Sequence, residues 1–296
     1  MSIQSLDSYL KDFYQTEKKS LLSNYPGLTL HRLKQDIKLQ AFLNGVDSEE
    51  LFDFPYLPYR SHPITIFFEK LKLGTPLEYI TGYAYFYRSL FKVTSDVLIP
   101  RSETEILVEL AGQEIQKNYR NKKCRVADIG TGSGVIALSL LMEQAAQLDM
   151  VITDISEEAL KLARENYFNL KYAISDIHKT SFIKSDRMRD VEGPFDLILS
   201  NPPYIKRSAD KKDVHNQVLD FEPHLALFLD DDSYDAWFDE FFTSIYEKLS
   251  PQGLSLVEGH EHHLESLAAR AKALGFKEVV VIKDYTNRNR FLKLKK

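Results

Sequence analysis

The chain has 296 residues, of which 44% are hydrophobic and 27% are charged, and its formal net charge is −5. This composition predicts a folded protein of one large or two modest domains. The acidic balance argues against a protein that binds nucleic acid through phosphate neutralisation. The single cysteine, Cys124, excludes an internal disulfide and suits a reducing cytosol. Because the chain starts without a signal-peptide pattern and its apolar runs are too short to cross a bilayer, we expect a cytoplasmic protein with no membrane partner.

The first part of the chain has the apolar spacing of amphipathic helices. Two such faces carry Leu6, Leu10, Phe13 and Tyr14, and then Leu30, Leu33, Ile37 and Phe42. We therefore expect a helical domain over residues 1–80. Residues 81–99 are rich in Tyr, Phe, Val and Thr, which predicts a β-hairpin. The motif Ser-Glu-Thr-Glu at residues 102–105 predicts a capping box at the start of the next helix.

From residue 124 onward, apolar strand-like runs alternate with helical stretches. The strand-like runs read CRVADI, MVITDI, SFIKSD, FDLILS, GLSLVEG, FKEVVVI and RFLKLKK. This alternation predicts an α/β fold with a mainly parallel sheet covered by helices on both faces. Residues 205–235 are polar and irregular, so we expect a long loop there. Four aromatic residues at helical spacing are expected in the core, namely Trp237, Phe238, Phe241 and Phe242.

A glycine-rich turn, ADIGTGSG, joins the first of these strands to a helix. Gly130, Gly132 and Gly134 permit a tight turn and let a ligand approach the backbone. Taken alone, they also fit a plain strand-to-helix turn. Their spacing differs from the dinucleotide-binding pattern and no P-loop lysine follows, so a phosphate cradle is disfavoured. Asp154 ends the next strand, where a carboxylate can accept hydrogen bonds from ribose hydroxyls. A nucleoside without a pyrophosphate fits these features, and S-adenosylmethionine is the common one.

The fourth strand-like run, FDLILS, leads into Asn201-Pro202-Pro203-Tyr204. Ligands bind beyond the carboxyl ends of strands in such sheets, so we expect Asn201 at the rim that carries the glycine turn. The prolines fix φ and lack N–H groups, so the loop presents carbonyl oxygens. The Asn201 oxygen and one carbonyl can accept both hydrogens of a planar NH₂ group, while Tyr204 packs on its plane. For this motif alone, a Pro-Pro turn with a surface tyrosine is the alternative.

Such a site predicts chemistry at an amide or amino nitrogen. An amide nitrogen is a poor nucleophile because its lone pair is delocalised. Hydrogen bonds from both of its protons increase its electron density and aim it at a methyl–sulfonium group, and positioning of this kind can supply roughly 7–11 kcal/mol of the barrier. The nitrogen becomes acidic once it is methylated, so no general base is required before transfer. We expect Asn201, Pro202 and Tyr204 to be the catalytic residues.

Together these motifs resemble those of the HemK/PrmC-type methyltransferases, a family that modifies the glutamine amide of peptide chain release factors. The matching stretches run in family order from residue 76 to about residue 229, and they read PLEYITGYAYFY, FKVTSDVLIPRSETEILVE, VADIGTGSGVIALSL, TDISEEALKLAREN, FDLILSNPPYI and FEPHLALF. The resemblance implies a Rossmann-like class I methyltransferase domain over residues 100–296, with a seven-stranded sheet that ends in an antiparallel strand. It also implies a helical substrate-recognition domain over residues 1–80 and a hairpin linker over residues 81–99. The implied cofactor is S-adenosyl-L-methionine and the implied partner is a release factor; we expect a monomer that needs no nucleic acid.

The resemblance also assigns site residues. It implies cofactor contacts from Asp128, Gly130, Thr131, Gly132, Ser133, Gly134, Asp154, Ile155, Asp186, Arg187 and Asn201. It implies substrate contacts from Asn201, Pro202, Pro203, Tyr204, Arg101 and Glu103, with Glu105 beside them. Asp186 stands where similar enzymes meet the adenine, although Arg187 replaces the apolar or aromatic residue that usually follows.

After residue 228 the chain departs from the family pattern. LDDDSYDAWF lacks the usual glycines and LVEGHEHH replaces a Glu-Ile-Gly strand end, and we expect these changes at the periphery of the site. His260, His262 and His263 do not have the HExxH spacing, so we interpret them as a solvated loop and expect no metal. The acidic run at residues 230–232 is expected to cap the helix that follows.

Other functions compete with methylation of the release factor Gly-Gly-Gln loop. Loops of the Asn-Pro-Pro-Tyr type also serve the exocyclic amines of adenine and cytosine, but the acidic charge disfavours a nucleic-acid substrate. A ribosomal-protein glutamine methyltransferase would use the same loop. A binding module that keeps the fold without catalysis is the third possibility, and the intact Gly130, Asp154 and Asn201 argue against it.

Overall fold

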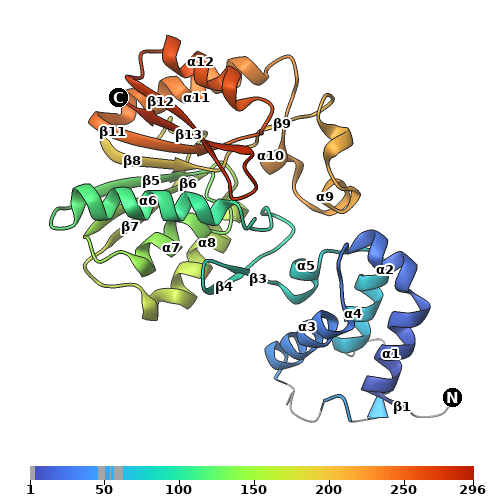
Figure 1. Cartoon of the computed structure of the whole chain (residues 1–296). Helices are drawn as coiled ribbons and strands as arrows, with labels where there is room; N and C mark the ends of the chain where they lie inside the picture. Colours follow the sequence, from blue (N-terminus) through green and yellow to red (C-terminus); the bar gives the residue numbers. More distant parts are fainter. Residues whose placement is uncertain (1–3, 46–50, 54, 57–62) are drawn as a thin grey trace. The chain divides into compact units, whose positions relative to one another are not determined.

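The computed structural model describes residues 4–45, 51–53, 55–56 and 63–296. The chain divides into two compact units (Figure 1). One comprises residues 1–83 with 215–221, and the other comprises residues 84–214 and 222–296. Within the part of the chain that the structure describes, no helix has both the length and the apolar character that crossing a bilayer requires.

The N-terminal unit is built mainly from helices. Its elements are β1 (Gln4–Ser5), α1 (Leu6–Thr16), α2 (Lys18–Asn24), α3 (Leu30–Leu43), β2 (Pro55–Tyr56), α4 (Pro63–Lys72), α5 (Leu77–Thr81) and α9 (Asn216–Phe221). Ser5 and Thr29 cap α1 and α3, because their side-chain oxygens accept hydrogen bonds from backbone N–H groups in the first turn of each helix.

The core of this unit follows most of the predicted helical faces. Leu6, Leu10 and Phe13 are buried on α1, as predicted. On α3 the buried stripe consists of Leu33, Ile37 and Ala41, at steps of four residues. The prediction that Phe42 joins this stripe is wrong: Phe42 lies one position beyond it and is 71% exposed.

The predicted hairpin consists of β3 (Tyr83–Phe86) and β4 (Ser89–Lys92), which form a two-stranded sheet. Tyr87 and Arg88 both have positive φ, +45° and +81°, as a tight two-residue hairpin turn requires. The Asn166 side chain accepts a hydrogen bond from Lys92 N–H and donates one to the Lys92 carbonyl. The hairpin is thereby tied to the helix that carries Asn166.

The second unit is organised by a seven-stranded sheet. Its strands are β5 (Cys124–Ile129), β6 (Leu148–Asp154), β7 (Lys179–Lys184), β8 (Phe195–Ser200), β11 (Leu249–Glu258), β12 (Glu278–Lys283) and β13 (Asn289–Lys295). Their order across the sheet is β12-β13-β11-β8-β5-β6-β7. β13 is antiparallel to both of its neighbours, whereas β11, β8, β5, β6 and β7 pair in parallel. The predicted Rossmann-like α/β fold is confirmed, including the antiparallel last strand.

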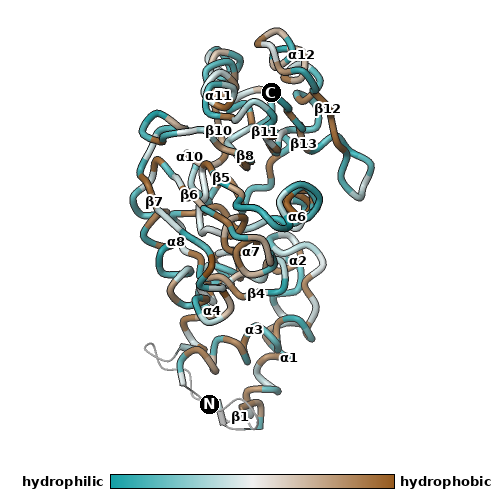
Figure 2. Tube along the Cα trace, turned by 90° about the vertical axis from the view of Figure 1, so that its left-hand side faces the viewer, coloured by the Kyte–Doolittle hydropathy of each residue, from teal (hydrophilic) through white to brown (hydrophobic). Residues whose placement is uncertain are grey.

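Helices cover both faces of this sheet (Figure 1). One apolar core contains residues of α6 (Thr104–Tyr119), α7 (Val135–Glu143) and the end of α8 (Glu157–Leu170), and the other contains residues of α11 (Tyr234–Lys248) and α12 (Leu264–Ala273). Successive strand residues alternate between the two cores, because side chains of a strand point to opposite faces. Figure 2 shows α7 as strongly apolar, in keeping with its burial.

The order of the strands determines where a ligand can bind. The chain runs from β5 outward to β6 and β7, and then returns to the other side of β5 as β8. The segments that leave β5 and β8 therefore diverge, and a crevice at the carboxyl ends of these two strands is the expected ligand site of such a sheet.

Residues 205–235 are more ordered than the sequence predicts. They contain β9 (Ile205–Lys206), a 3₁₀ turn (Lys211–Asp213), α9, α10 (His224–Leu227) and β10 (Phe228–Leu229). The predicted helix cap by residues 230–232 is wrong, because α11 has no side-chain cap. Asp231 instead accepts hydrogen bonds from the N–H groups of Ser208 and Ala209, so the acidic run holds the segment after the Asn-Pro-Pro-Tyr motif.

Candidate active site

A cavity of about 410 Å³ opens at the carboxyl ends of β5, β6 and β8. It brings together predicted site residues from distant segments, namely Arg101, Gly130, Thr131, Gly132, Ser133, Asp154, Ile155, Asp186, Arg187, Asn201, Pro202 and Pro203. Asp128, Gly134, Glu103 and Tyr204, which were also predicted as site residues, do not line this cavity. Trp237 and Phe241 line it, although the sequence predicts them only as core.

The glycine turn forms one wall of the cavity. Gly130 and Gly132 have φ values of +68° and +56°, a region that residues with a Cβ rarely adopt. A Cβ at either position would meet no atom within 4 Å, so the backbone conformation and not crowding demands glycine. Gly134, with φ +87°, immediately precedes α7, and a Cβ there would lie only 3.2 Å from Leu138 and 3.3 Å from Ala163, so here both conformation and crowding demand glycine.

Asp128 supports this turn from beneath. Its Oδ2 accepts hydrogen bonds from the Thr131 hydroxyl at 2.6 Å and from Ala137 N–H at 3.2 Å. The side chain is fully buried, and burial raises the pKa of Asp128 to about 7. Asp128 therefore connects the glycine turn to the first turn of α7.

Asp154 stands opposite the glycine turn, at the end of β6. Its two carboxylate oxygens accept hydrogen bonds from the N–H groups of Gly132 and Ser156, each at 2.9 Å. Burial raises the pKa of Asp154, and these backbone hydrogen bonds oppose that rise because they favour the carboxylate. A carboxylate has about four acceptor sites, so Asp154 retains capacity for the hydroxyl groups of a ligand in the cavity.

Asn201 takes part in a chain of side-chain hydrogen bonds. Its amide nitrogen donates to Thr104 Oγ1 at 3.1 Å, and the Thr104 hydroxyl donates to Glu258 Oε2 at 2.8 Å. Tyr204 Oη donates to Glu258 Oε1 at 3.3 Å. Because the Asn201 NH₂ group is turned toward Thr104, the Oδ1 atom is left without a hydrogen bond from the described residues. Asn201 lines the cavity, and its Oδ1 is available as a hydrogen-bond acceptor.

Glu258 lies at the centre of this chain, at the end of β11. It is fully buried, and burial raises its pKa to about 7 against the hydrogen bond from Thr104, the positive charge of Arg290 and the hydrogen bond from Tyr204. Glu258 does not line the cavity, in keeping with the expected peripheral position of the LVEGHEHH segment, but it contacts the site through Thr104 and Tyr204. The sequence signal was its position at the end of the strand beside β8.

Tyr204 is directed toward the interior. Besides its hydroxyl contact with Glu258, its backbone carbonyl accepts a hydrogen bond from the Tyr234 hydroxyl at 3.2 Å, and its ring packs against the α11–α12 core. Tyr204 thus anchors the Asn-Pro-Pro-Tyr loop to β11 and α11. Its role as a flat face above a substrate amide remains a prediction.

The Pro-Arg-Ser-Glu-Thr-Glu segment contains the start of α6 and two charged side chains, Arg101 and Glu105, that contact different parts of the unit. The predicted capping box is wrong: α6 begins at Thr104, and the residue before it makes no side-chain cap. Arg101 lines the cavity and pairs with the buried Glu222 at 2.6 Å, and Glu222 also accepts a hydrogen bond from Ile99 N–H. Glu105 accepts a hydrogen bond from Tyr87 N–H and so braces the hairpin. Glu222 lies in FEPHLALF, one of the stretches that resemble the methyltransferase family, and this resemblance was the sequence signal for a role of Glu222 at the site.

The other end of the cavity is aromatic and charged. Asp186 binds Arg187 through both carboxylate oxygens at 3.1 Å, and Arg187 also pairs with Glu240 at 2.7 Å. The Arg187 guanidinium lies over the Trp237 ring, 5.5 Å from its centroid. Where the resembling family has an apolar or aromatic residue, this chain therefore has a flat guanidinium group whose positive charge is balanced by Asp186 and Glu240.

The described site can bind a compact ligand with hydroxyl groups between Asp154 and the glycine turn, and it offers acceptor oxygens at Asn201 and at the prolines. S-adenosylmethionine, the cofactor implied by the sequence, fits the glycine turn and Asp154, because the turn leaves open space and Asp154 retains acceptor capacity.

Comparison with known proteins places the chain in a family. A family model described as "Methyltransferase small domain" matches residues 104–224. A "Release factor glutamine methyltransferase" of Flavobacterium psychrophilum is 33% identical over 225 residues, which cover 76% of this chain and 77% of the relative. One of Leptospira interrogans is 32% identical over 267 residues, covering 90% and 86%. One of Streptococcus pneumoniae is 45% identical over 166 residues, covering 56% and 55%.

The two longer matches extend over most of both chains, and the family model covers the segment from the start of α6 to α10, which contains the glycine turn, Asp154 and Asn201. The chain is a methyltransferase and belongs to the release factor glutamine methyltransferase family.

Proposed function

We propose that this chain transfers the methyl group of S-adenosylmethionine to the side-chain amide nitrogen of a glutamine in a peptide chain release factor, most specifically in its Gly-Gly-Gln motif. In this reaction a nitrogen–carbon bond forms as the carbon–sulfur bond breaks. The sulfur keeps the bonding electron pair, which leaves S-adenosylhomocysteine, and the amide nitrogen releases a proton to water. The names of the relatives support the substrate class.

The orientation of Asn201 is the observation that carries this proposal. Asn201 lines the cavity and its NH₂ group is engaged by Thr104, which leaves Oδ1 available as an acceptor. A glutamine amide offers two N–H donors, which Asn201 Oδ1 and the Pro202 carbonyl accept. The amide plane then lies at the attack position, where positioning alone can contribute roughly 7–11 kcal/mol.

The cofactor is held by the opposite end of the cavity. In this proposal Asp154 accepts hydrogen bonds from the ribose hydroxyls, and the turn from Gly130 to Ser133 lets the methionyl part approach the backbone. Ile155 and Trp237 pack beside the adenine, with Asp186 and Arg187 at its edge. The bound cofactor supplies the electrophilic methyl group.

The helical unit supplies recognition of the protein substrate in this proposal, and the enzyme acts in the cytoplasm as a monomer. A protein substrate explains why the chain has a helical unit with its own apolar core, formed by residues such as Leu33, Ile37 and Phe67. No nucleic acid is required, in keeping with the net charge of −5.

The test is transfer of a labelled methyl group to purified release factor. The wild-type protein is compared with Asn201→Ala and with Asn118→Ala, an exposed asparagine on α6 that serves as a matched control. We expect Asn201→Ala to lower kcat by at least about 100-fold when the cofactor is saturating, and Asn118→Ala to have the wild-type rate. A release factor whose loop glutamine is replaced by alanine should take no label.

The other outcomes separate the alternatives. Label on a ribosomal protein but not on release factor would keep the chemistry and reject the substrate. Label on nucleic acid would select the amino methyltransferase. Cofactor binding with no transfer to any of these acceptors would reject catalysis.

A further inference from the structure

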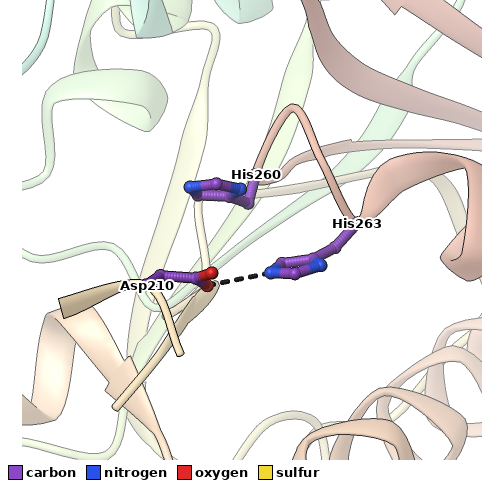
Figure 3. A group of neighbouring side chains, drawn as sticks. All are labelled: Asp210, His260 and His263. Carbon is purple, nitrogen blue, oxygen red and sulfur yellow. Dashed lines mark hydrogen bonds and ion pairs between the residues drawn. The ribbon is translucent and has the colours of Figure 1, made fainter. Parts of the chain in front are cut away.

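Three side chains outside the cavity converge at one point. Asp210, from the segment after β9, meets His260 and His263, from the loop between β11 and α12 (Figure 3). Each residue offers one ligand atom, and these atoms lie within 4.8 Å of one another. His263 Nε2 and Asp210 Oδ2 are 2.8 Å apart. We propose that Asp210, His260 and His263 form a binding site for a divalent transition-metal ion, with Zn²⁺ as the ion that fits best.

Hydrogen-bonded turns hold the three ligands in place. His263 N–H donates to the His260 carbonyl at 3.0 Å, and this turn sets the two rings face to face, with centroids 4.9 Å apart and planes inclined by 31°. Asp210 N–H donates to the Lys206 carbonyl, and Asp210 Oδ2 accepts a hydrogen bond from Lys206 N–H at 2.8 Å. Both loops are therefore preorganised, and metal binding would order little additional backbone.

The chemistry of these ligands suits zinc. Two imidazole nitrogens and one carboxylate oxygen are the ligand set of zinc sites that keep a fourth position for water. Tetrahedral bonds of about 2.0–2.2 Å place neighbouring ligand atoms roughly 3.3 Å apart. The observed separations, from 2.8 Å to at most 4.8 Å, reach that arrangement with small side-chain movements. Asp210 Oδ1 accepts no hydrogen bond from the described residues and is a second available ligand oxygen.

Burial distinguishes this cluster from the solvated loop that the sequence predicts. Asp210 is only 7% exposed, and His260 and His263 are partly buried. The rings of Tyr204 and Tyr234 lie 6.4 Å from His260 and 5.3 Å from His263.

A simple His263–Asp210 hydrogen bond would explain two of these residues but not the third. His260 faces His263, and its Nδ1 accepts a long hydrogen bond from His262 N–H at 3.4 Å, so among the described residues its ring is held by the backbone and not by a carboxylate. A bound divalent cation would use all three side chains, with one nitrogen from each imidazole and one oxygen from Asp210. The metal would join the segment that follows Tyr204 to the loop that follows Glu258.

The test uses the full-length protein after treatment with a chelator. Zn²⁺ is titrated in competition with a chromophoric chelator, and Co²⁺ is used as a spectroscopic probe of tetrahedral coordination. The ligand variants are Asp210→Asn, His260→Gln and His263→Gln. His262→Gln is the matched control, because His262 lies in the same loop with its side chain 69% exposed.

We expect one Zn²⁺ per chain, an intense visible spectrum with Co²⁺, and a loss of affinity of at least about 100-fold in each ligand variant. His262→Gln should bind like the wild type. Asp210→Asn keeps the size of the side chain. If this variant loses Zn²⁺ affinity while its unfolding temperature in the presence of chelator equals that of the wild type, misfolding is excluded as the cause. Absence of stoichiometric binding in the wild type, or an equal loss in His262→Gln, would overturn the proposal.

Discussion

At the scale of single residues, the orientation of one amide group decides what the site can accept. An asparagine side chain has both an acceptor oxygen and a donor nitrogen. The Thr104 hydroxyl accepts a hydrogen bond from the Asn201 nitrogen and donates one to Glu258. Glu258 accepts a second hydrogen bond from the Tyr204 hydroxyl. When Glu258 is ionised, above its pKa of about 7, it can only accept, and the direction of every hydrogen bond in the chain is then determined. Thr104 and Glu258 are therefore positioning residues for Asn201.

The first prediction removes the central hydroxyl. Thr104→Val keeps the shape of the side chain but leaves the Asn201 NH₂ group and Glu258 without their shared partner. We expect kcat for methyl transfer to fall about 10- to 100-fold, with an unchanged dissociation constant for S-adenosylmethionine. Thr104→Ser should restore most of the rate. Equal rates for Thr104→Val and wild type would show that Asn201 is oriented without Thr104.

The second prediction concerns pH and the buried Glu258. Its pKa in the folded protein is about 7, compared with an ordinary value of 4.5, so the folded state holds the proton more tightly than the unfolded state. The contribution to stability is therefore fully present below about pH 4.5 and is lost as the pH rises through about 7. A difference of about 2.5 in pKa corresponds to about 3 kcal/mol.

Glu258→Gln should accordingly flatten the fall in the free energy of unfolding between pH 4.5 and about 7, by up to about 3 kcal/mol. Denaturant unfolding at a series of pH values measures this. Glu247→Gln, at an exposed position on α11, is the control and should follow the wild-type curve. Asp128 also has a pKa near 7 and keeps its own contribution in both variants. Superimposable curves for Glu258→Gln and wild type would contradict the prediction.

At the scale of secondary-structure elements, the glycine turn shows how a local conformation serves a ligand. The turn after β5 has three glycines with positive φ, and Asp128 holds it from below through Thr131. Its N–H groups and its open space depend on a backbone that residues with a Cβ adopt only at a cost. The turn is therefore a rigid part of the cavity wall.

The third prediction separates strain from ligand binding. Gly132→Ala and Gly27→Ala both introduce a Cβ at positive φ, +56° and +80°, into open space. Each should therefore lower stability by about 1–2 kcal/mol. Only Gly132→Ala should also weaken S-adenosylmethionine, by about tenfold or more, because Gly132 lines the cavity. Isothermal titration calorimetry with both variants measures this, and equal affinities would assign the glycine to folding alone.

Elements differed in how well the sequence predicted them. The strands β5, β6 and β8 and the helices between them follow from apolar runs and helical periodicity, which are local properties. The capping box at residues 102–105 failed because Thr104 and Glu105 bond to distant partners, Glu258 and Tyr87, and not to the local backbone. The prediction of an irregular loop over residues 205–235 was wrong because hydrogen bonds to Asp231, and not apolar periodicity, order part of this segment.

At the scale of the whole molecule, two units have separate cores. The helical unit packs around residues such as Leu33 and Phe67, and the sheet unit around its own two apolar layers. Separate cores allow each unit to unfold in its own transition. Tyr25 is a probe for the first unit, because its buried hydroxyl donates to the carbonyls of Leu71 and Thr75.

The fourth prediction follows. Differential scanning calorimetry should resolve two transitions, and saturating S-adenosylmethionine should raise only that of the sheet unit, by mass action on its folded state. Tyr25→Phe leaves two carbonyls without this donor and should lower only the other transition, by about 1 kcal/mol. A single transition that moves as one with either change would show that the units unfold together.

The sequence by itself determined the class of fold and the chemistry at the cavity. Strand and helix periods, the glycine turn, Asp154 and Asn201 are local features, and the rule that ligands bind beyond the carboxyl ends of parallel strands brings them together without coordinates. The composition of the chain also sufficed to predict a folded protein, and the helical spacing of its apolar residues predicted a separate helical part.

Only the tertiary structure revealed the partners of these residues. Glu258 stands 154 residues from Thr104, Glu222 stands 121 residues from Arg101, and Asp210 stands 53 residues from His263. No periodicity or spacing relates such pairs. Thr104 meets Glu258 because α6 packs against β11. Asp210 meets His263 because β11 pairs with β8, so that the segments after these two strands leave the same edge of the sheet. Burial and pKa depend on these contacts, so the carboxyl that orients Asn201 and the histidine–aspartate cluster became visible only in the folded chain.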